Sequence, residues 1–111
     1  RYCFTWEYDG SSNLKLGQHN AMINCCLEEL GVTFGFSGNV IAIDETDTAS
    51  FWCPCYCAYG AEFEIYNLSP GTYTFVVDDP YYSIYYGTVF QFTVDLVNEP
   101  MGYYAPFVGS P

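Results

Sequence analysis

Apolar and polar side chains alternate along much of this 111-residue chain, in short runs separated by turn-forming residues. In the first run, over residues 2–8, Phe4 and Trp6 share the apolar face. A period of two is typical of a β-strand with one buried face, and helical periodicity is almost absent. We therefore predict an all-β fold, a two-sheet antiparallel sandwich of about seven strands over residues 1–100, with an irregular tail over 101–111.

The same alternation of apolar and polar residues assigns an inner face to each of the other runs. The predicted inward residues are Ala21, Ile23, Cys25 and Leu27, then Val32, Phe34 and Phe36, then Ile41 and Ile43, then Tyr73, Phe75 and Val77, and finally Phe90, Phe92, Val94 and Leu96. Leu14 and Leu16 have the opposite parity to Ala21, which predicts a β-bulge at Gly17. The polar stretch 44–50 is predicted to be a loop.

Between positions 51 and 65, three cysteines and a set of apolar residues occupy every second position and would therefore share one face of a strand. They are Phe51, Cys53, Cys55, Cys57, Tyr59, Ala61, Phe63 and Ile65. If this strand is unbroken, its three cysteines face inward. Because Pro54 cannot donate a hydrogen bond to a neighbouring strand and Gly60 weakens the strand, we expect the cysteine half to be an edge or an irregular lead-in.

Cysteine is abundant for a chain of this length. The six cysteines are Cys3, Cys25, Cys26, Cys53, Cys55 and Cys57. An even number in a short sequence favours a disulfide-stabilised domain in an oxidising compartment, although spacing alone leaves the connectivity open. A thiolate metal site is the alternative. Residues two apart on a strand lie roughly 6.6 Å apart, too far for their sulfurs to share one tetrahedral ion, so we predict no metal and no cofactor.

Charge restricts the possible partners. Arg1 and Lys15 are the only basic residues against thirteen carboxylates, which gives a net charge of −11 at pH 7. Such a surface repels phosphate backbones and anionic lipid headgroups, so nucleic acid is not an expected partner. No apolar run approaches the ~20 residues of a membrane-spanning helix, so no transmembrane segment is expected. Oligomeric state is not set by any of these features.

Catalytic motifs are absent from the sequence, and we expect a protein that is not an enzyme. His19 is the single histidine, which leaves one possible base for a nucleophile and excludes a multi-histidine metal site. Glu62 and Glu64 would be separated by roughly the 5.5 Å of retaining glycosidase carboxylates. Alternating charges on an exposed strand face are routine, however, so we predict no catalytic residue.

Tyrosine is the most unusual part of the composition, with twelve copies. The candidate binding residues, near a loop or on the parity opposite to the core, are Trp52, Tyr56, Tyr66, Tyr81, Tyr82, Tyr85 and Tyr86. Exposed tyrosines commonly mark binding surfaces because each offers an apolar ring and a polar tip at low entropic cost. We therefore expect a non-catalytic module that binds a glycan or a protein. A purely structural spacer and a thiolate metal-binding domain are the alternatives.

Two patterns carry a resemblance to known domains. The segment Leu68-x-Pro70-Gly71-x-Tyr73 resembles the corner before the penultimate strand of immunoglobulin-like and fibronectin-type sandwiches, in which a tyrosine hydroxyl ties the loop to the strand. The resemblance implies an immunoglobulin-like sandwich with Tyr73 in that role. By analogy with the disulfide that crosses an immunoglobulin core, it also implies bridges between the Cys25-Cys26 pair and the cluster 53–57, with Cys3 left for the remaining sulfur.

The second pattern covers about half of the chain. Its blocks are His19-Asn20-Ala21, Asn24-Cys25-Cys26, Cys53-x-Cys55-x-Cys57 and Phe63-Glu64-Ile65-x-Asn67-Leu68-x-Pro70-Gly71-x-Tyr73-Thr74. These blocks resemble an uncharacterised group of secreted or lipid-anchored bacterial domains, to which no activity is assigned. The resemblance implies a protein that is secreted or attached to the bacterial cell surface.

Overall fold

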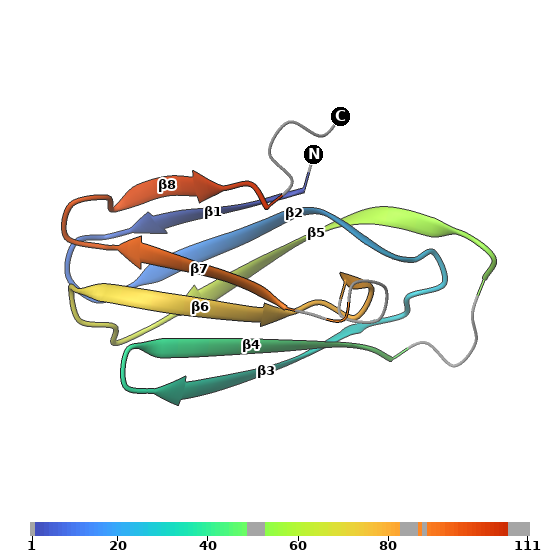
Figure 1. The fold of residues 1–111 in the computed structure, drawn as a ribbon, viewed down its shortest axis with the longest axis horizontal. Coiled ribbons are helices and arrows are strands. Elements are labelled where there is room, and N and C mark those ends of the chain that lie inside the picture. Colours follow the sequence, from blue (N-terminus) through green and yellow to red (C-terminus); the bar gives the residue numbers. More distant parts are fainter. Residues whose placement is uncertain (1, 49–52, 83–86, 88, 107–111) are drawn as a thin grey trace.

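The computed structural model describes residues 2–48, 53–82, 87 and 89–106, which form two layers of β-strands (Figure 1). The strands are β1 (Cys3–Tyr8), β2 (Leu14–Asn24), β3 (Leu30–Ser37), β4 (Val40–Asp47), β5 (Tyr56–Ile65), β6 (Thr72–Asp78), β7 (Phe90–Asp95) and β8 (Met101–Tyr104). They build two four-stranded sheets, sheet A in the order β5-β2-β1-β8 and sheet B in the order β3-β4-β6-β7. The predicted all-β, two-sheet architecture is confirmed.

The core between the sheets consists mainly of the inward faces that alternation predicts. Its buried members include Phe4, Trp6, Leu14, Leu16, Ala21, Ile23, Ile41, Ile43, Phe63, Ile65, Phe75, Val77, Phe90, Phe92, Val94 and Leu96. Aromatic rings join the two layers at its centre. The ring of Phe92 in sheet B lies 5.1 Å from that of Phe4 and 4.8 Å from that of Tyr104, both in sheet A. Such pairs add about 0.5–1.5 kcal/mol each beyond area burial.

Strand β3 lies at the edge of sheet B, and its aromatic residues are less covered than predicted. Phe34 and Phe36 pair with Ile43 and Ile41 and therefore point to the inner side of the sheet. They remain 37% and 61% exposed, although the ring of Phe63 lies 5.9 Å from that of Phe34. The predicted inward direction of Phe34 and Phe36 is confirmed, but at the edge of the sheet these side chains lack a full covering layer.

The β-bulge in β2 lies later than predicted. Gly17 pairs regularly with both neighbouring strands, and the register between β2 and β5 shifts between Gln18 and Ala21. Asn20 adopts a left-handed conformation, with φ of 61°, at this point. Asparagine tolerates that region better than most residues do, so it can serve the bulge in place of glycine. The shift lets Leu16 and Ala21 both face the core.

Two further expectations about sheet B are wrong. The stretch 44–50, predicted as a loop, continues β4 as far as Asp47, and Glu45 on this strand is buried with one carboxyl oxygen accepting a hydrogen bond from Gln18. The sheet is also not purely antiparallel, since β4 and β6 pair in parallel with Asp44 opposite Asp78. Between these two strands the chain leaves sheet B, forms β5 in sheet A and returns, which permits the parallel pairing.

The segment 101–111 is not wholly irregular. Its first residues form β8, which pairs with β1 and puts Tyr103 opposite Thr5. Gly102 lies opposite Trp6, whose indole occupies the space of the missing side chain. A four-residue strand centred on glycine gives too short an alternation to be recognised from sequence. Residues 107–111 lie outside the described part of the chain.

The corner before β6 contains the tyrosine bond that the resemblance implies. The hydroxyl of Tyr73 donates a hydrogen bond of 2.6 Å to the backbone oxygen of Ser69. A second tyrosine reinforces the same loop from sheet A, because the buried Tyr8 hydroxyl donates to the Leu68 oxygen at 2.6 Å. The loop between β5 and β6 is therefore tied to both sheets.

Candidate functional site

Two disulfides link the end of β2 to the segment that precedes and begins β5. Cys25 is bonded to Cys57, with 5.0 Å between their Cα atoms, and Cys26 is bonded to Cys53, with 5.6 Å. Both bridges join the groups of cysteines that the immunoglobulin analogy implies. The third expected bridge is absent, because Cys3 and Cys55 carry free thiols. Cys3 lies on β1, whereas the other five cysteines gather where β2 ends and β5 begins.

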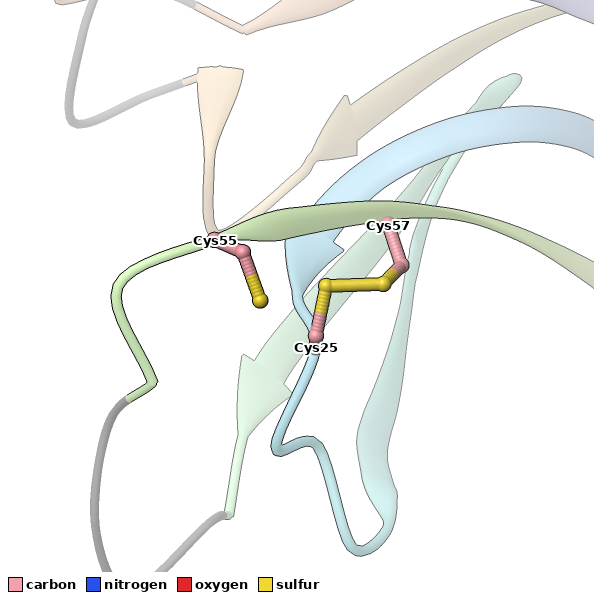
Figure 2. A group of neighbouring side chains, drawn as sticks. All are labelled: Cys25, Cys55 and Cys57. Atoms are coloured by element: carbon pink, nitrogen blue, oxygen red, sulfur yellow. A yellow bond between two sulfur atoms is a disulfide. The ribbon is translucent and has the colours of Figure 1, made fainter.

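Three sulfur atoms converge at this end of the molecule. The Sγ atoms of Cys25, Cys55 and Cys57 all lie within 4.8 Å of one another (Figure 2). Strand spacing predicts a larger separation between Cys55 and Cys57. That estimate fails because β5 begins only at Tyr56, so Cys55 belongs to the irregular lead-in. The expectation that the cysteine half is an edge or a lead-in is confirmed, since β5 also lies at the edge of sheet A.

Asn24 holds this irregular segment in place. Its side chain is 2% exposed and bonds four backbone groups. The Nδ2 atom donates to the oxygens of Cys53, at 2.6 Å, and Cys55, at 3.3 Å, while Oδ1 accepts from the nitrogens of Cys26 and Cys53. The sequence analysis names Asn24 only as part of the block Asn24-Cys25-Cys26 and gives it no structural role. Its position directly before two cysteines is the only signal that the sequence offers.

The sulfur group can do two kinds of chemistry. Three thiolates at this separation match the requirements of a soft metal ion, since metal–sulfur bonds of about 2.3 Å put ligand sulfurs roughly 4 Å apart. In the present structure Cys25 and Cys57 are bonded to each other, so metal binding first requires reduction of that bridge. A thiol beside a disulfide is, by contrast, already arranged for thiol–disulfide exchange.

A second candidate site covers the outer face of sheet A. A pair of adjoining shallow depressions, of about 230 and 370 Å³, shares the lining residues Glu7 and Lys15. We call it the outer groove and define it by Thr5, Glu7, Lys15, His19, Glu62, Glu64, Tyr66, Met101 and Tyr103. The cross-strand registers explain the gathering, since Met101, Glu7, Lys15 and Glu64 follow one another across β8, β1, β2 and β5.

The floor of the outer groove has a fixed geometry. Gly17 carries no side chain between Thr5 and Glu62, and the imidazole of His19 occupies that space. The Nε2 atom of His19 lies 2.8 Å from the Thr5 Oγ1 atom, in hydrogen-bonding contact. Cys3 is opposite His19 in the strand register, a juxtaposition that the sequence alone does not reveal.

Tyr66 and Tyr103 occupy opposite ends of the outer groove. Their side chains are 61% and 74% exposed. The Tyr66 hydroxyl donates to a Glu64 carboxylate oxygen, and this hydrogen bond raises the pKa of Tyr66 above its ordinary value. The bond orients the Tyr66 ring at the groove edge. Tyr103 was assigned to the tail, so its place in the sheet was missed.

Three of the other candidate binding residues, Tyr56, Tyr81 and Tyr82, are described by the structure and do not line the outer groove. The ring of Tyr56 meets that of Tyr81 edge to face at 4.8 Å, near the sulfur group. Tyr82 stacks on the core ring of Phe90, with 3.9 Å between centroids, and so contributes to packing. Trp52, Tyr85 and Tyr86 lie outside the described residues.

A buried polar network fills one end of the core. Gln18 Nε2 donates to Tyr2 Oη at 2.6 Å and to Glu45 Oε1 at 3.1 Å, and Tyr2 donates to Asp79 Oδ2 at 2.6 Å. Burial, with Asp79 and Asp78 nearby, raises the pKa of Glu45 to about 7 despite the opposing Gln18 bond. The sequence analysis predicted a polar loop at the position of Glu45, which the structure instead buries.

Comparison of the chain with family models, with curated proteins and with solved structures found no match. Within the part of the chain that the structure describes, no helix has the length and apolar character needed to span a bilayer.

Proposed function

We propose that this protein is a non-catalytic binding module that acts outside the cytoplasm and holds a neutral glycan in the outer groove. The observation that carries the proposal is the pair of exposed tyrosines, Tyr66 and Tyr103, each lining one of two adjoining depressions that share Glu7 and Lys15. Strand spacing puts their positions on the order of 20 Å apart. That length suits an oligosaccharide chain better than a single sugar.

The chemistry of the groove supports a sugar ligand. The tyrosine rings offer flat apolar faces against which the C–H face of a pyranose can pack. Between them, Glu7, Glu62 and Glu64 present hydrogen-bond acceptors for hydroxyl groups. Binding sites commonly combine apolar contact area with a few well-placed polar groups in this way.

The charge of the protein narrows the class of glycan. The net charge is −11, and Lys15 and His19 are the only Lys, Arg or His residues among the described residues that line the groove. Uronic-acid, sulfated and phosphorylated polymers would be repelled at this face, so the ligand is a polymer without anionic groups. The same repulsion disfavours an acidic protein partner.

The proposed compartment and fold family have separate support. Two disulfides favour an oxidising environment, and hence a secreted or cell-surface protein. An immunoglobulin-like sandwich is favoured by the neighbours β5-β2-β1 in one sheet and β6-β7 in the other, together with the Tyr73 corner. The parallel β4–β6 pair and the added β8 make this a variant of that fold.

Affinity electrophoresis through gels that contain neutral β-glucan, mannan or galactan tests the proposal. We expect one of these polymers to retard the protein, and Tyr66→Ala or Tyr103→Ala to weaken binding about three- to tenfold, because each removes one ring contact of about 1 kcal/mol. Phe36→Ala is the matched control, since Phe36 is 61% exposed, like Tyr66, but lies in sheet B. Absence of retardation in every gel, or equal loss in the control, contradicts the proposal and favours a structural spacer.

A further inference from the structure

The free thiol of Cys55 lies directly beside the Cys25–Cys57 disulfide. All three sulfur atoms are within 4.8 Å of one another. Figure 2 shows the Cys55 side chain pointing toward the Cys25 end of the bridge, on the side away from Cys57. Exchange between a thiol and a disulfide proceeds by attack of the thiolate on one sulfur while the other sulfur leaves. The arrangement therefore selects Cys25 as the sulfur attacked and Cys57 as the leaving group.

The backbone allows Cys25 to pair with either partner. The ladder between β2 and β5 ends with Ile23 opposite Cys57 and Asn24 opposite Tyr56, and its continuation brings Cys25 opposite Cys55. The Cys25 amide donates a hydrogen bond of 3.2 Å to the Cys55 oxygen, so the two backbones are already adjacent. A bridge between directly opposed residues falls within the ordinary Cα separations of disulfides.

We propose that Cys25, Cys55 and Cys57 form a thiol–disulfide exchange centre with two alternative bridges. The Cys55 thiolate attacks the Cys25 sulfur, a Cys25–Cys55 bond forms and the Cys25–Cys57 bond breaks. Cys57 leaves as a thiolate and takes up the proton that Cys55 released. The step is an isomerisation that leaves the number of thiols and disulfides unchanged, so it needs no oxidant or reductant. It is independent of the proposed glycan site.

The exchange changes which thiol faces solvent. Cys55 is exposed, whereas Cys57 is partly buried. With the bridge at Cys25–Cys57, a small disulfide from solution can react with the thiol at Cys55. With the bridge at Cys25–Cys55, the thiol moves to the less accessible Cys57. The centre is therefore a reactive site for external disulfides that has an open and a protected isomer.

The surrounding contacts keep the two segments together in both isomers. The Cys26–Cys53 bridge joins the same segments independently of Cys25. Asn24 bonds the backbone of Cys53, Cys55 and Cys26 and involves no sulfur atom. Local exchange at Cys25 consequently does not require the strands to separate.

Position-specific labelling of the unmodified protein tests the proposal. The protein is held in mildly alkaline buffer, where thiolate is more abundant, then quenched with acid and labelled with a maleimide in acidic denaturant. Disulfide-linked peptides are mapped without reduction. We expect one population labelled at Cys55 with Cys25–Cys57 intact, and a second labelled at Cys57 with Cys25–Cys55 formed. Cys3 is labelled throughout because its thiol is also free. Label that stays confined to Cys3 and Cys55 after prolonged incubation, with none at Cys57, overturns the proposal.

Two variants complete the experiment. In Cys55→Ser the label at Cys57 should disappear, and its persistence would overturn the proposal by showing that Cys57 is released by another route. In Cys57→Ser refolded with oxidised glutathione, a Cys25–Cys55 bridge should form. Two thiols remaining at those positions in a folded Cys57→Ser protein would also overturn the proposal. If that variant does not fold, the labelling of the unmodified chain still tests whether the bridge exchanges between Cys57 and Cys55.

Discussion

Gln18 in sheet A donates a hydrogen bond of 3.1 Å to the buried carboxyl group of Glu45 in sheet B. The second carboxyl oxygen of Glu45 has no hydrogen-bond partner among the described residues, and the side chain is only 5% exposed. A charge at this position is poorly solvated, and the carboxylates of Asp79 and Asp78 oppose it. The two sheets therefore meet around a group that is more stable when it carries a proton.

The stability of the protein should fall as the pH rises from about 4.5 to about 7. The folded-state pKa of Glu45 is about 7 against an ordinary value of 4.5, so the folded state binds the proton more tightly. The contribution is complete below pH 4.5 and is lost as pH rises through 7, by about 3 kcal/mol. Urea unfolding across this range measures it. In Glu45→Gln the fall should be largely removed, and an unchanged slope would contradict the prediction.

Asp9 has the opposite effect on stability, and it acts at lower pH. Three backbone amides, those of Ser12, Ser11 and Asn13, donate to Asp9 and lower its pKa to about 2. Its stabilising contribution is present above the ordinary carboxyl pKa and is lost as pH falls toward 2. Below the ordinary carboxyl pKa of 3.8, stability is therefore expected to fall as the pH decreases.

Replacement of Asn24 by alanine should destabilise the protein by about 2–4 kcal/mol. The change removes four hydrogen bonds to backbone groups, two of them on Cys53, and leaves those groups without partners. Thermal unfolding under non-reducing conditions measures the loss. Asn98→Ala is the control, because Asn98 is exposed, and it should change stability by less than about 0.5 kcal/mol. Equal effects of the two changes would disprove the role assigned to Asn24.

Thiol titration in denaturant should find two free thiols without reductant and six after reduction. The two are Cys3 and Cys55, and intramolecular exchange leaves their number unchanged. Reduction of both bridges should also lower the free energy of unfolding by about 5–6 kcal/mol in total. The first bridge closes a loop of 27 or 32 residues, and the second, nested beside it, closes only a short additional loop. Six free thiols before reduction would instead support the thiolate metal alternative, and none would reveal a third bridge.

Gly102→Ala should destabilise β8 by about 1–3 kcal/mol. An added Cβ would lie 2.4 Å from Cζ2 of the Trp6 indole, which is packed inside the core and hydrogen-bonded to the Glu99 oxygen. Gly35→Ala in β3 is the control, since its nearest neighbour would be the Ala42 Cβ at 3.7 Å, an ordinary contact. Comparison of their urea midpoints checks the prediction. A Gly102→Ala protein as stable as the control would contradict the close packing of Trp6.

Alternation predicted those parts of the fold in which a regular strand has one covered face. Phe4 and Trp6, or Phe92 and Val94, are buried as their parity requires. Parity carries no information about what lies opposite a strand, so it could not show that Phe36 is exposed. It also fails at Asn20, where a left-handed residue resets the count.

The candidate sites depend on contacts that no local pattern encodes. The grouping of Cys25 and Cys26 with the later cysteines was expected by analogy, but the closeness of Cys55 to Cys57 depends on the chain becoming regular only at Tyr56. The outer groove depends on β8, which is too short to be predicted. The network of Gln18 and Glu45 joins strands from both sheets, and their side chains meet only in the assembled core.

The parallel pairing of β4 with β6 has a consequence for how the chain folds. Because β5 belongs to the opposite sheet, neither layer can be completed from a continuous stretch of sequence. The β4 neighbour of β6 must be recruited across the whole of β5, and closing such a loop costs entropy before any contact is gained. Folding should consequently be slow for a chain of this size, and the two layers should assemble in a single cooperative step.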